Sequence, residues 1–258
     1  MDFGPEQSVH GLTWGQQHGG YFSDPTVAQM MVQAVGAVWD QARPDVIVDL
    51  GGGTGFWLSH WRKSGLGKTA RLVVLDASAS QVAQARRTGL DCVQAEVGCF
   101  KRDEVVPRGM HVLFAMRSVL HYAGEFGWRE LVDHIRSQTL PGEFWVHQTA
   151  CFERQEDAAC LNALYRKMHT GKWYPTVQKL HEGLIEANWN VASIQSAPTL
   201  NLASEELGAR YGLSPSDLKR IQREMVAEHG CDSPVFHAAA TGFQAHLHYR
   251  IWCCQAVP

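Results

Sequence analysis

Residues 46–57 of the chain read VIVDLGGGTGFW, an apolar run that ends at an acid and continues into four glycines within five positions. A short apolar run that leads into a glycine-rich turn is typical of a buried strand followed by a ligand-binding loop. Such loops can hold a pyrophosphate, a nucleoside triphosphate or a cofactor that has no phosphate. The spacing of the glycines therefore decides which kind of ligand the loop favours.

The spacing does not match the dinucleotide fingerprint G-x-G-x-x-G/A. Counted from Gly51, the third glycine would fall at Phe56, and counted from Gly53 it would fall at Leu58. A nicotinamide-dependent oxidoreductase is therefore a disfavoured alternative.

A second glycine-containing stretch, SGLGKTAR at residues 64–71, looks like the end of a triphosphate-binding P-loop. That motif requires a glycine at the position of Arg62, and it requires a strand before the loop and a helix after it. Here the stretch lies between a predicted helix and a predicted strand. It is interpreted as an ordinary basic connection.

What remains is an acid followed by alternating glycines, at Asp49, Gly51, Gly53 and Gly55. This pattern resembles motif I of the class I S-adenosylmethionine-dependent methyltransferases. Glycines allow the backbone to approach a ligand closely, and the N-terminus of the following helix directs N–H groups toward a carboxylate. Because no phosphate is required, the pattern favours this sulfonium cofactor.

The next predicted strand ends in the sequence RLVVLDAS, which places Asp76 at its carboxyl end. An acid at this position can accept hydrogen bonds from both ribose hydroxyls of a nucleoside. In the family that the chain resembles, this acid is motif II and binds the ribose. The alternative role for Asp76 is to cap the following helix, and its place after the glycine loop favours the ligand role.

The resemblance covers about residues 45–195 and implies further cofactor contacts. In VQAEVGCF, Glu96 stands where family members often have an aspartate that binds the adenine amino group, and Val97 follows beside the ring. At the end of the fourth strand, the family's backbone around Met116 and Arg117 often touches the cofactor. The predicted cofactor-binding residues are Asp49, Gly51, Gly52, Gly53, Gly55, Asp76, Ala77, Glu96, Val97, Met116, Arg117 and Tyr21.

His121 is the predicted catalytic base for an acceptor hydroxyl. It lies in SVLHY, which resembles a segment of small-molecule O-methyltransferases in which the histidine acts as base, although Tyr122 and Ala123 replace the Asp-Trp found there. An equal alternative is that His121 packs beneath the loop. For Arg117, the alternatives to a cofactor contact are an acidic acceptor or a surface ion pair. The predicted substrate-binding residues are Phe22, Tyr122, Trp173 and Tyr174.

Strands alternate with helices along the chain, which predicts a doubly wound, mostly parallel α/β sheet. Residues 243–252 alternate strictly between apolar and other residues, as is typical of a half-exposed antiparallel strand. With the resemblance, this predicts a seven-stranded Rossmann-like methyltransferase fold with an antiparallel last strand. We expect one domain over residues 1–258, with an N-terminal helical cap or lid at 1–44 and a helical insertion at 198–241. The glycines beside Tyr21 also suggest a mobile flap over the cofactor.

Composition narrows the class of protein. The chain has 258 residues, of which 45% are hydrophobic and 19% charged, with a formal net charge of -3, so a basic nucleic-acid-binding face is not expected. No apolar run is long enough to cross a membrane, and the first twenty residues lack the features of a signal peptide. Seven cysteines without a CxxC pair suggest a reduced, cytoplasmic protein with no metal site.

These features predict a cytoplasmic enzyme of secondary metabolism that uses S-adenosyl-L-methionine to methylate oxygen or nitrogen of a small-molecule acceptor. One alternative is a non-catalytic S-adenosylmethionine-binding or partner protein on the same fold. Another is a protein or RNA methyltransferase. The sequence predicts no oligomeric state.

Overall fold

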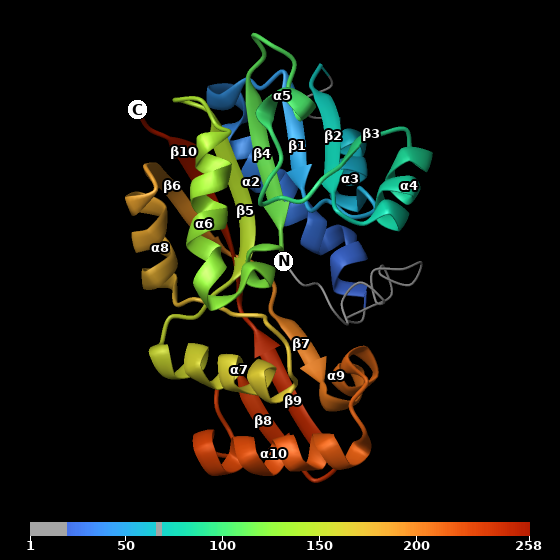
Figure 1. The fold of residues 1–258 in the computed structure, drawn as a ribbon, viewed down its shortest axis with the longest axis vertical. Coiled ribbons are helices and arrows are strands. Elements are labelled where there is room, and N and C mark those ends of the chain that lie inside the picture. Colours follow the sequence, from blue (N-terminus) through green and yellow to red (C-terminus); the bar gives the residue numbers. More distant parts are fainter. Residues whose placement is uncertain (1–19, 66–68) are drawn as a thin grey trace.

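The computed structural model describes residues 20–65 and 69–258. Within them, seven strands form a large sheet in the order β3-β2-β1-β4-β5-β10-β6, and three strands form a small sheet in the order β7-β9-β8 (Figure 1). In the large sheet, β10 runs antiparallel to both of its neighbours, whereas β1 to β5 are parallel. The predicted mostly parallel seven-stranded sheet with an antiparallel last strand is therefore confirmed.

The central strand of the site is β1, which is buried along its whole length between β2 and β4. Its Asp49 lies beside Ala115 of β4, and Arg117 of β4 lies beside Gln148 of β5. Because alternate residues of a strand point to the same face, Asp49, Arg117 and Gln148 share one face of the sheet near its carboxyl edge. The strands of the large sheet are β1 (Val46–Leu50), β2 (Arg71–Asp76), β3 (Asp91–Gln94), β4 (Val112–Arg117), β5 (Phe144–Ala150), β6 (Trp189–Ser196) and β10 (Tyr249–Ala256).

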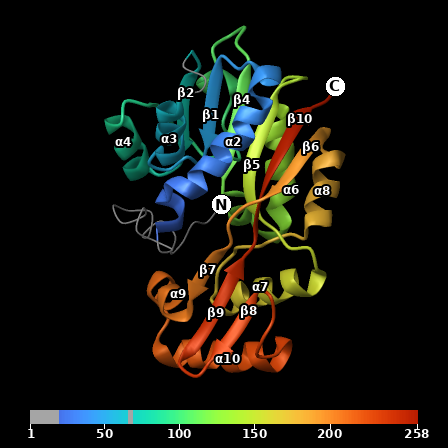
Figure 2. The same cartoon turned by 180° about the vertical axis from the view of Figure 1, so that it is seen from behind.

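Helices cover both faces of this sheet, as Figures 1 and 2 show from opposite sides. Each layer is held by its own apolar cluster between helices and strands. The helices on one face are α2 (Pro25–Ala42), α3 (Phe56–Ser64) and α4 (Ala79–Arg87), and those on the other are α5 (Arg102–Val105), α6 (Gly124–Ser137) and α8 (Val177–Glu186).

The helix ends follow local sequence signals. The Asp24 side chain accepts a hydrogen bond from the Thr26 amide at 2.7 Å, and Pro25 fills the first position of α2. Thr176 caps α8 in the same way. After α8, Asn188 has a φ of 60°, the left-handed conformation in which asparagine often ends a helix. Residues next to each helix end therefore decide where these helices begin and stop.

The prediction of one continuous last strand over residues 243–252 is wrong. The chain instead forms β9 (Gly242–Leu247) in the small sheet and β10 in the large sheet, with a break at His248. Phe243 packs in the core of the small unit, whereas Ile251 packs between the large sheet and α2. β10 is also buried over most of its length, not half-exposed, because α2 covers one face of the sheet there and α8 covers the other. Two consecutive strands give the same alternating sequence pattern as one long strand, so the pattern does not reveal the break at His248.

The segment 198–241, which we expected to be a helical insertion, contains two strands as well as two helices. Together with β9 and α7 (Gln155–Lys167), it builds a small unit beyond the carboxyl ends of the parallel strands (Figure 1). Apolar side chains from α7, α10 and the small sheet form its core. The elements of the segment are β7 (Leu200–Ala203), α9 (Ser204–Tyr211), α10 (Pro215–His229) and β8 (Phe236–Ala239).

Of the expected N-terminal cap at residues 1–44, only residues 20–44 are described. Residues 20–23 form a 3-10 turn, and α2 packs flat on the sheet with buried side chains such as Met31 and Val35. This helix is therefore a layer of the core and not a lid. Most of the first twenty residues, on which the signal-peptide prediction depends, lie outside the described residues, as do Gly67 and Lys68 of the P-loop-like stretch.

His147 should give the core a pH-dependent stability. It is fully buried in β5, with its ring 4.1 Å from that of Trp145, and burial lowers the pKa of His147 from 6.5 to about 3. The unfolded chain takes up this proton near pH 6.5 and the folded chain does not. The free energy of unfolding should therefore fall as pH drops below 6.5, by up to about 1.4 kcal/mol per pH unit from this residue.

Urea unfolding of the wild-type protein and of His147→Gln at several pH values would measure this effect. The variant should lose less stability than the wild type between about pH 7 and pH 4, because glutamine does not titrate. The same change at the exposed His181 of α8 is the matched control for the substitution itself. Equal pH dependence in the wild type and His147→Gln would contradict the prediction.

Candidate functional site

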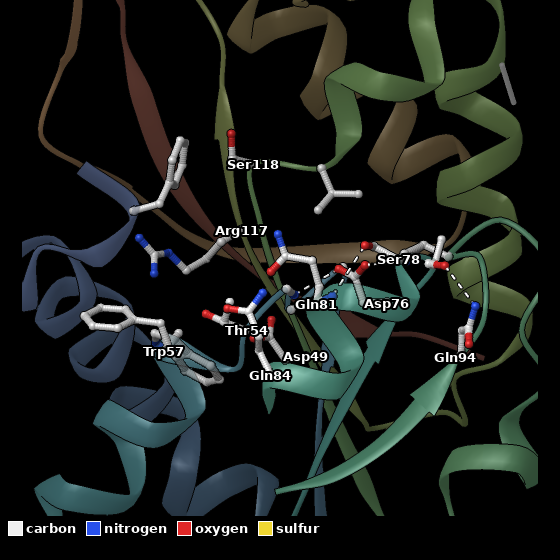
Figure 3. A pocket seen from close by; sticks show the side chains of 18 of the residues that line it. Asp49, Thr54, Trp57, Asp76, Ser78, Gln81, Gln84, Gln94, Arg117 and Ser118 are labelled. Atoms are coloured by element: carbon white, nitrogen blue, oxygen red, sulfur yellow. Dashed lines mark hydrogen bonds between the residues drawn. The ribbon is translucent and has the colours of Figure 1, made fainter. Parts of the chain in front are cut away.

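A cavity of about 1020 Å³ opens at the carboxyl edge of β1, β2 and β4. Ligands of doubly wound sheets bind at this edge, and the volume lies at the upper end of the range for small-molecule sites. In Figure 3, Gln94 and Ser78 lie at one end of the cavity and Arg117 and Trp57 at the other, with Asp76 between them. The cavity is therefore elongated, with different chemistry at its two ends.

The glycine loop follows β1, as predicted. Gly51 and Gly55 have φ angles of 67° and 73°, which side chains with a Cβ rarely adopt. A Cβ on Gly51 would lie 2.6 Å from a methyl carbon of Val119, and one on Gly55 would lie 2.5 Å from a methyl carbon of Leu90. Gly51 lines the cavity, whereas Gly55 precedes α3 and packs against the core. Gly55 thus shapes the loop instead of lining the site.

Asp76 connects the glycine loop to the next helix. One carboxylate oxygen accepts a hydrogen bond from the Gly53 amide at 2.9 Å, and the other accepts one from the Ser78 amide at 2.8 Å. The cap of α4 is Ser78, so the capping alternative for Asp76 does not describe the structure. Asp76 lines the cavity, and a carboxylate at the end of this strand is the group that accepts hydrogen bonds from ribose hydroxyls in doubly wound nucleoside sites.

Asp49 is a buried acid whose side chain is only 2% exposed. Burial raises the pKa of Asp49 from 3.8 to about 7, while Arg117 opposes the rise and Asp76 adds to it. Its Oδ1 is buried and has no hydrogen-bond partner among the described residues. Since buried polar atoms are nearly always hydrogen-bonded in folded proteins, this oxygen is suited to a donor on a ligand.

Arg117 also lines the cavity. Its Nε donates a hydrogen bond to Gln148 at 3.3 Å, and its Nη2 is buried without a hydrogen-bond partner among the described residues. Burial lowers the pKa of Arg117, and the nearby Asp49 opposes this. Tyr21, predicted to touch the cofactor, is not among the lining residues. Its hydroxyl donates to the Pro198 carbonyl at 2.6 Å and accepts from Gln148 at 3.0 Å.

At the opposite end of the cavity, the predicted residues Ala77, Glu96 and Val97 line the wall together with Gln94. The Gln94 side chain donates to the Ala77 carbonyl at 3.4 Å. An apolar side chain beside polar acceptors suits a flat heteroaromatic ring with an exocyclic amino group. The predicted adenine contacts Glu96 and Val97 therefore both belong to the cavity lining.

His121 does not line the cavity. It is 6% exposed and lies in the 3-10 helix η2 (Leu120–Ala123), where its ring centre is 4.1 Å from that of Tyr122 and stacks at 5.3 Å on Tyr174. The Trp173 amide donates to the His121 carbonyl at 3.2 Å. The packing alternative for His121 therefore describes the structure, and the catalytic prediction finds no geometric support.

The predicted residues divide into two groups. The cavity lining includes Asp49, Gly51, Gly52, Gly53, Asp76, Ala77, Glu96, Val97, Arg117, Phe22 and Tyr122. It does not include Gly55, Met116, Tyr21, His121, Trp173 or Tyr174. Met116 and Trp173 belong to the core between the sheet and α6, and Tyr174 belongs to the core of the small unit. Met116 is excluded because alternation along β4 directs it to the opposite face from Arg117.

Several lining residues were not predicted from the sequence. They come mainly from the first turns of the helices that follow the glycine loop and Asp76. The Trp57 indole N–H and the Gln84 amide nitrogen are buried without a hydrogen-bond partner among the described residues. The first turn after each motif is the sequence signal that could have indicated them. The lining residues that were not predicted include Thr54, Trp57, Ser78, Gln81, Gln84, Ser118 and Val119.

Residues from the small unit support one wall of the cavity. Arg210 of α9 donates to the hydroxyl of the lining residue Tyr122 at 3.5 Å, and the Lys172 ammonium lies 4.8 Å from the centre of the Tyr122 ring. Ser118, which has a φ of 56°, shares a 2.6 Å hydrogen bond with Tyr249. Side chains from the small unit, from the segment between α7 and α8 and from β10 therefore position this wall, which begins directly after Arg117.

Two negative findings apply to the described part of the chain. Residues 20–65 and 69–258 contain no group of three or more His, Cys, Asp or Glu side chains placed to hold a metal ion. None of the helices in these ranges has the length and apolar character needed to cross a membrane.

No protein-family model matches the chain, and no curated protein matches its sequence. Solved structures match its fold. The YcgJ protein of Bacillus subtilis matches with a TM-score of 0.65 at 11% identity, over 88% of this chain and 99% of that one. Geranyl diphosphate C-methyltransferase of Streptomyces coelicolor, in complex with Mg²⁺, geranyl diphosphate and S-adenosylhomocysteine, matches at 0.51 with 12% identity, over 88% and 79%.

Human N-acetylserotonin methyltransferase, in complex with S-adenosylmethionine, matches with a TM-score of 0.51 at 14% identity, over 94% of this chain and 59% of that one. At these identities the likeness is one of fold. The chain has the Rossmann-like fold of class I methyltransferases, as the resemblance predicted.

Proposed function

We propose that the protein is an S-adenosylmethionine-dependent methyltransferase that acts on a small-molecule acceptor. The supporting observation is the arrangement of one elongated cavity. Asp76 lies between an end that contains Gln94 and a charged end that contains Arg117. Buried atoms at the charged end, among them Asp49 Oδ1, have no hydrogen-bond partner among the described residues. The fold, the glycine spacing and the absence of a phosphate requirement support the same cofactor.

The residues fit the cofactor part by part. Glu96 and Val97 would hold the adenine, and the Asp76 carboxylate would accept hydrogen bonds from the ribose hydroxyls. Asp49 Oδ1 would accept from the ammonium of the methionine part, next to the glycine loop. α3 begins directly after the glycine loop, and the partial positive charge at a helix N-terminus favours a carboxylate nearby.

When bound, S-adenosylmethionine supplies an electrophilic methyl group for in-line displacement by the acceptor. The protein's own contribution is orientation and the exclusion of water. Phe22 and Tyr122 line the cavity beside Ser118, so apolar rings and a hydroxyl would position the acceptor. We propose an amine or hydroxyl as the acceptor group. Since His121 does not line the cavity, no proton transfer is assigned to it.

A second candidate function is cofactor binding without turnover. It is favoured by one observation, namely that the lining within the described residues includes no histidine that could act as a base. Methyl transfer to an unprotonated amine needs no such residue. Finding an acceptor that is methylated would therefore distinguish the methyltransferase from a protein that only binds the cofactor.

Thermal unfolding with S-adenosylhomocysteine, NAD or ATP tests the cofactor. A ligand at about 100 times its Kd stabilises by roughly 2.7 kcal/mol, so S-adenosylhomocysteine alone should raise the unfolding midpoint by about 5–10 °C. A rise with NAD instead would support the oxidoreductase alternative.

Label transfer from tritiated S-adenosylmethionine to a library of small-molecule acceptors then distinguishes an enzyme from a protein that only binds the cofactor. Label found only in protein or RNA would contradict the small-molecule proposal.

A further inference from the structure

Two oppositely charged side chains lie at the cavity end away from Gln94 (Figure 3). Asp49 and Arg117 project from adjacent strands on the same face of the sheet. Each has a buried atom, Oδ1 in Asp49 and Nη2 in Arg117, without a hydrogen-bond partner among the described residues. The guanidinium hydrogen-bonds to Gln148, so one donor edge is left for another group.

A buried anion and a buried cation with unsatisfied atoms are costly unless a ligand completes their hydrogen bonds. The ligand must offer an acceptor to Arg117 and a donor to Asp49 within one small group. The head of an α-amino acid has this chemistry, because it carries a carboxylate and an ammonium on one carbon. A guanidinium also matches a carboxylate in geometry, since it can donate two parallel hydrogen bonds.

The Arg117 guanidinium is held in place by a chain of hydrogen bonds that runs through Gln148 and Tyr21 to the Pro198 carbonyl. Arg117 Nε donates to Gln148 Oε1 at 3.3 Å, Gln148 Nε2 donates to the Tyr21 hydroxyl at 3.0 Å, and that hydroxyl donates to the Pro198 carbonyl at 2.6 Å. The Tyr21 O–H is used in the hydrogen bond to the Pro198 carbonyl, so the hydroxyl oxygen is an acceptor for the Gln148 amino group. The amide oxygen is thereby directed toward Arg117.

We infer that Arg117 selects ligands with a free carboxylate at this end of the cavity, and that Gln148 and Tyr21 are positioning residues for its guanidinium. This inference rests on the proposed function, because S-adenosylmethionine and S-adenosylhomocysteine both end in an amino-acid head. It also gives Tyr21 a role that does not require contact with the cofactor.

Calorimetric titration with two ligands tests the inference. S-adenosylhomocysteine has the amino-acid head, whereas 5′-methylthioadenosine has the same nucleoside and sulfur without it. Arg117→Met should lower the affinity for S-adenosylhomocysteine by about 10- to 100-fold, the loss of a charge-assisted carboxylate contact. Its affinity for 5′-methylthioadenosine should stay close to that of the wild type. Arg117→Lys should recover part of the loss, because it restores the charge without the two-pronged geometry.

Tyr21→Phe should lower the affinity for S-adenosylhomocysteine by a smaller factor, about 3- to 10-fold, and should also spare 5′-methylthioadenosine. The matched control is Arg223→Met, at an exposed arginine of α10, which should change neither affinity. Unfolding midpoints near that of the wild type would show that the variants are folded.

Equal losses for both ligands in Arg117→Met would overturn the inference alone, because Arg117 would then only shape the cavity. Unchanged affinity for S-adenosylhomocysteine would also overturn it, in favour of the role for Arg117 in binding an acidic acceptor. Failure of both ligands to bind the wild-type protein would overturn the proposed function together with the inference.

Discussion

Replacing Asp76 with asparagine should lower the affinity for S-adenosylhomocysteine by about 100-fold or more. The Asp76 oxygens accept from the amides of Gly53 at 2.9 Å and Ser78 at 2.8 Å, and the same carboxylate is proposed to accept from the ribose hydroxyls. A charge-assisted hydrogen bond contributes roughly 1.5–3 kcal/mol, so losing two of them explains the size of the effect. Asparagine would also turn an amino group toward one of the two backbone amides.

Titration of this variant with S-adenosylhomocysteine and with 5′-methylthioadenosine would locate the effect. Both ligands contain the ribose, so both should lose affinity to a similar extent, unlike the selective loss expected for Arg117→Met. Asp133→Asn, at an exposed aspartate of α6, is the matched control. A loss for S-adenosylhomocysteine alone, or no loss, would contradict the proposed ribose contact.

Replacing Asp49 with asparagine should have opposite effects on stability and on binding. Burial raises the pKa of Asp49 from 3.8 to about 7, so the folded protein holds a proton that the unfolded chain releases. The stability that this proton contributes is fully present below about pH 4 and is lost as pH rises to about 7. At about pH 8 the ligand-free variant should therefore be more stable than the wild type, by at least about 1 kcal/mol.

Binding should change in the other direction, because only ionised Asp49 attracts the ligand's ammonium. The affinity of the wild type for S-adenosylhomocysteine should rise as pH increases toward 7, while that of Asp49→Asn should be weaker and nearly independent of pH in this range. Urea unfolding and calorimetric titration at about pH 5 and pH 8 would measure both effects. If Asp49→Asn were less stable than the wild type at about pH 8, the raised pKa of the buried Asp49 carboxyl would be contradicted.

The part of the cavity built from the glycine loop and Asp76 was predictable because its signals are local. Asp49 and Asp76 each stand at or near the end of an apolar strand, and parallel strands bring such ends to the same edge of the sheet. The glycines follow from the backbone angles that the turn requires, as Gly51 shows with its φ of 67°. A reader of the sequence needs only the order of strand, loop and helix to place these residues.

The acceptor side could not be predicted in the same way. His121 and Tyr122 are neighbours in η2, yet Tyr122 lines the cavity and His121 packs against Tyr174. Adjacent residues of a tight helical turn point in different directions, and the sequence does not say which direction faces the ligand. The aromatic character that suggested a pocket also suits a buried core, which is where Trp173 and Tyr174 lie.

By itself, the sequence determined the parallel strands, the glycine loop, the helix caps and the acid at the end of β2. These features depend on residues within a few positions of one another, where backbone geometry and hydrophobic periodicity act directly. Tertiary structure decided the division of residues 243–252 between two sheets, because strand partners are distant in the chain. It also decided the contacts of Arg117 with Gln148 and of Gln148 with Tyr21, which join residues 31 and 127 positions apart. Contacts at such separations form only when the whole sheet brings their strands together.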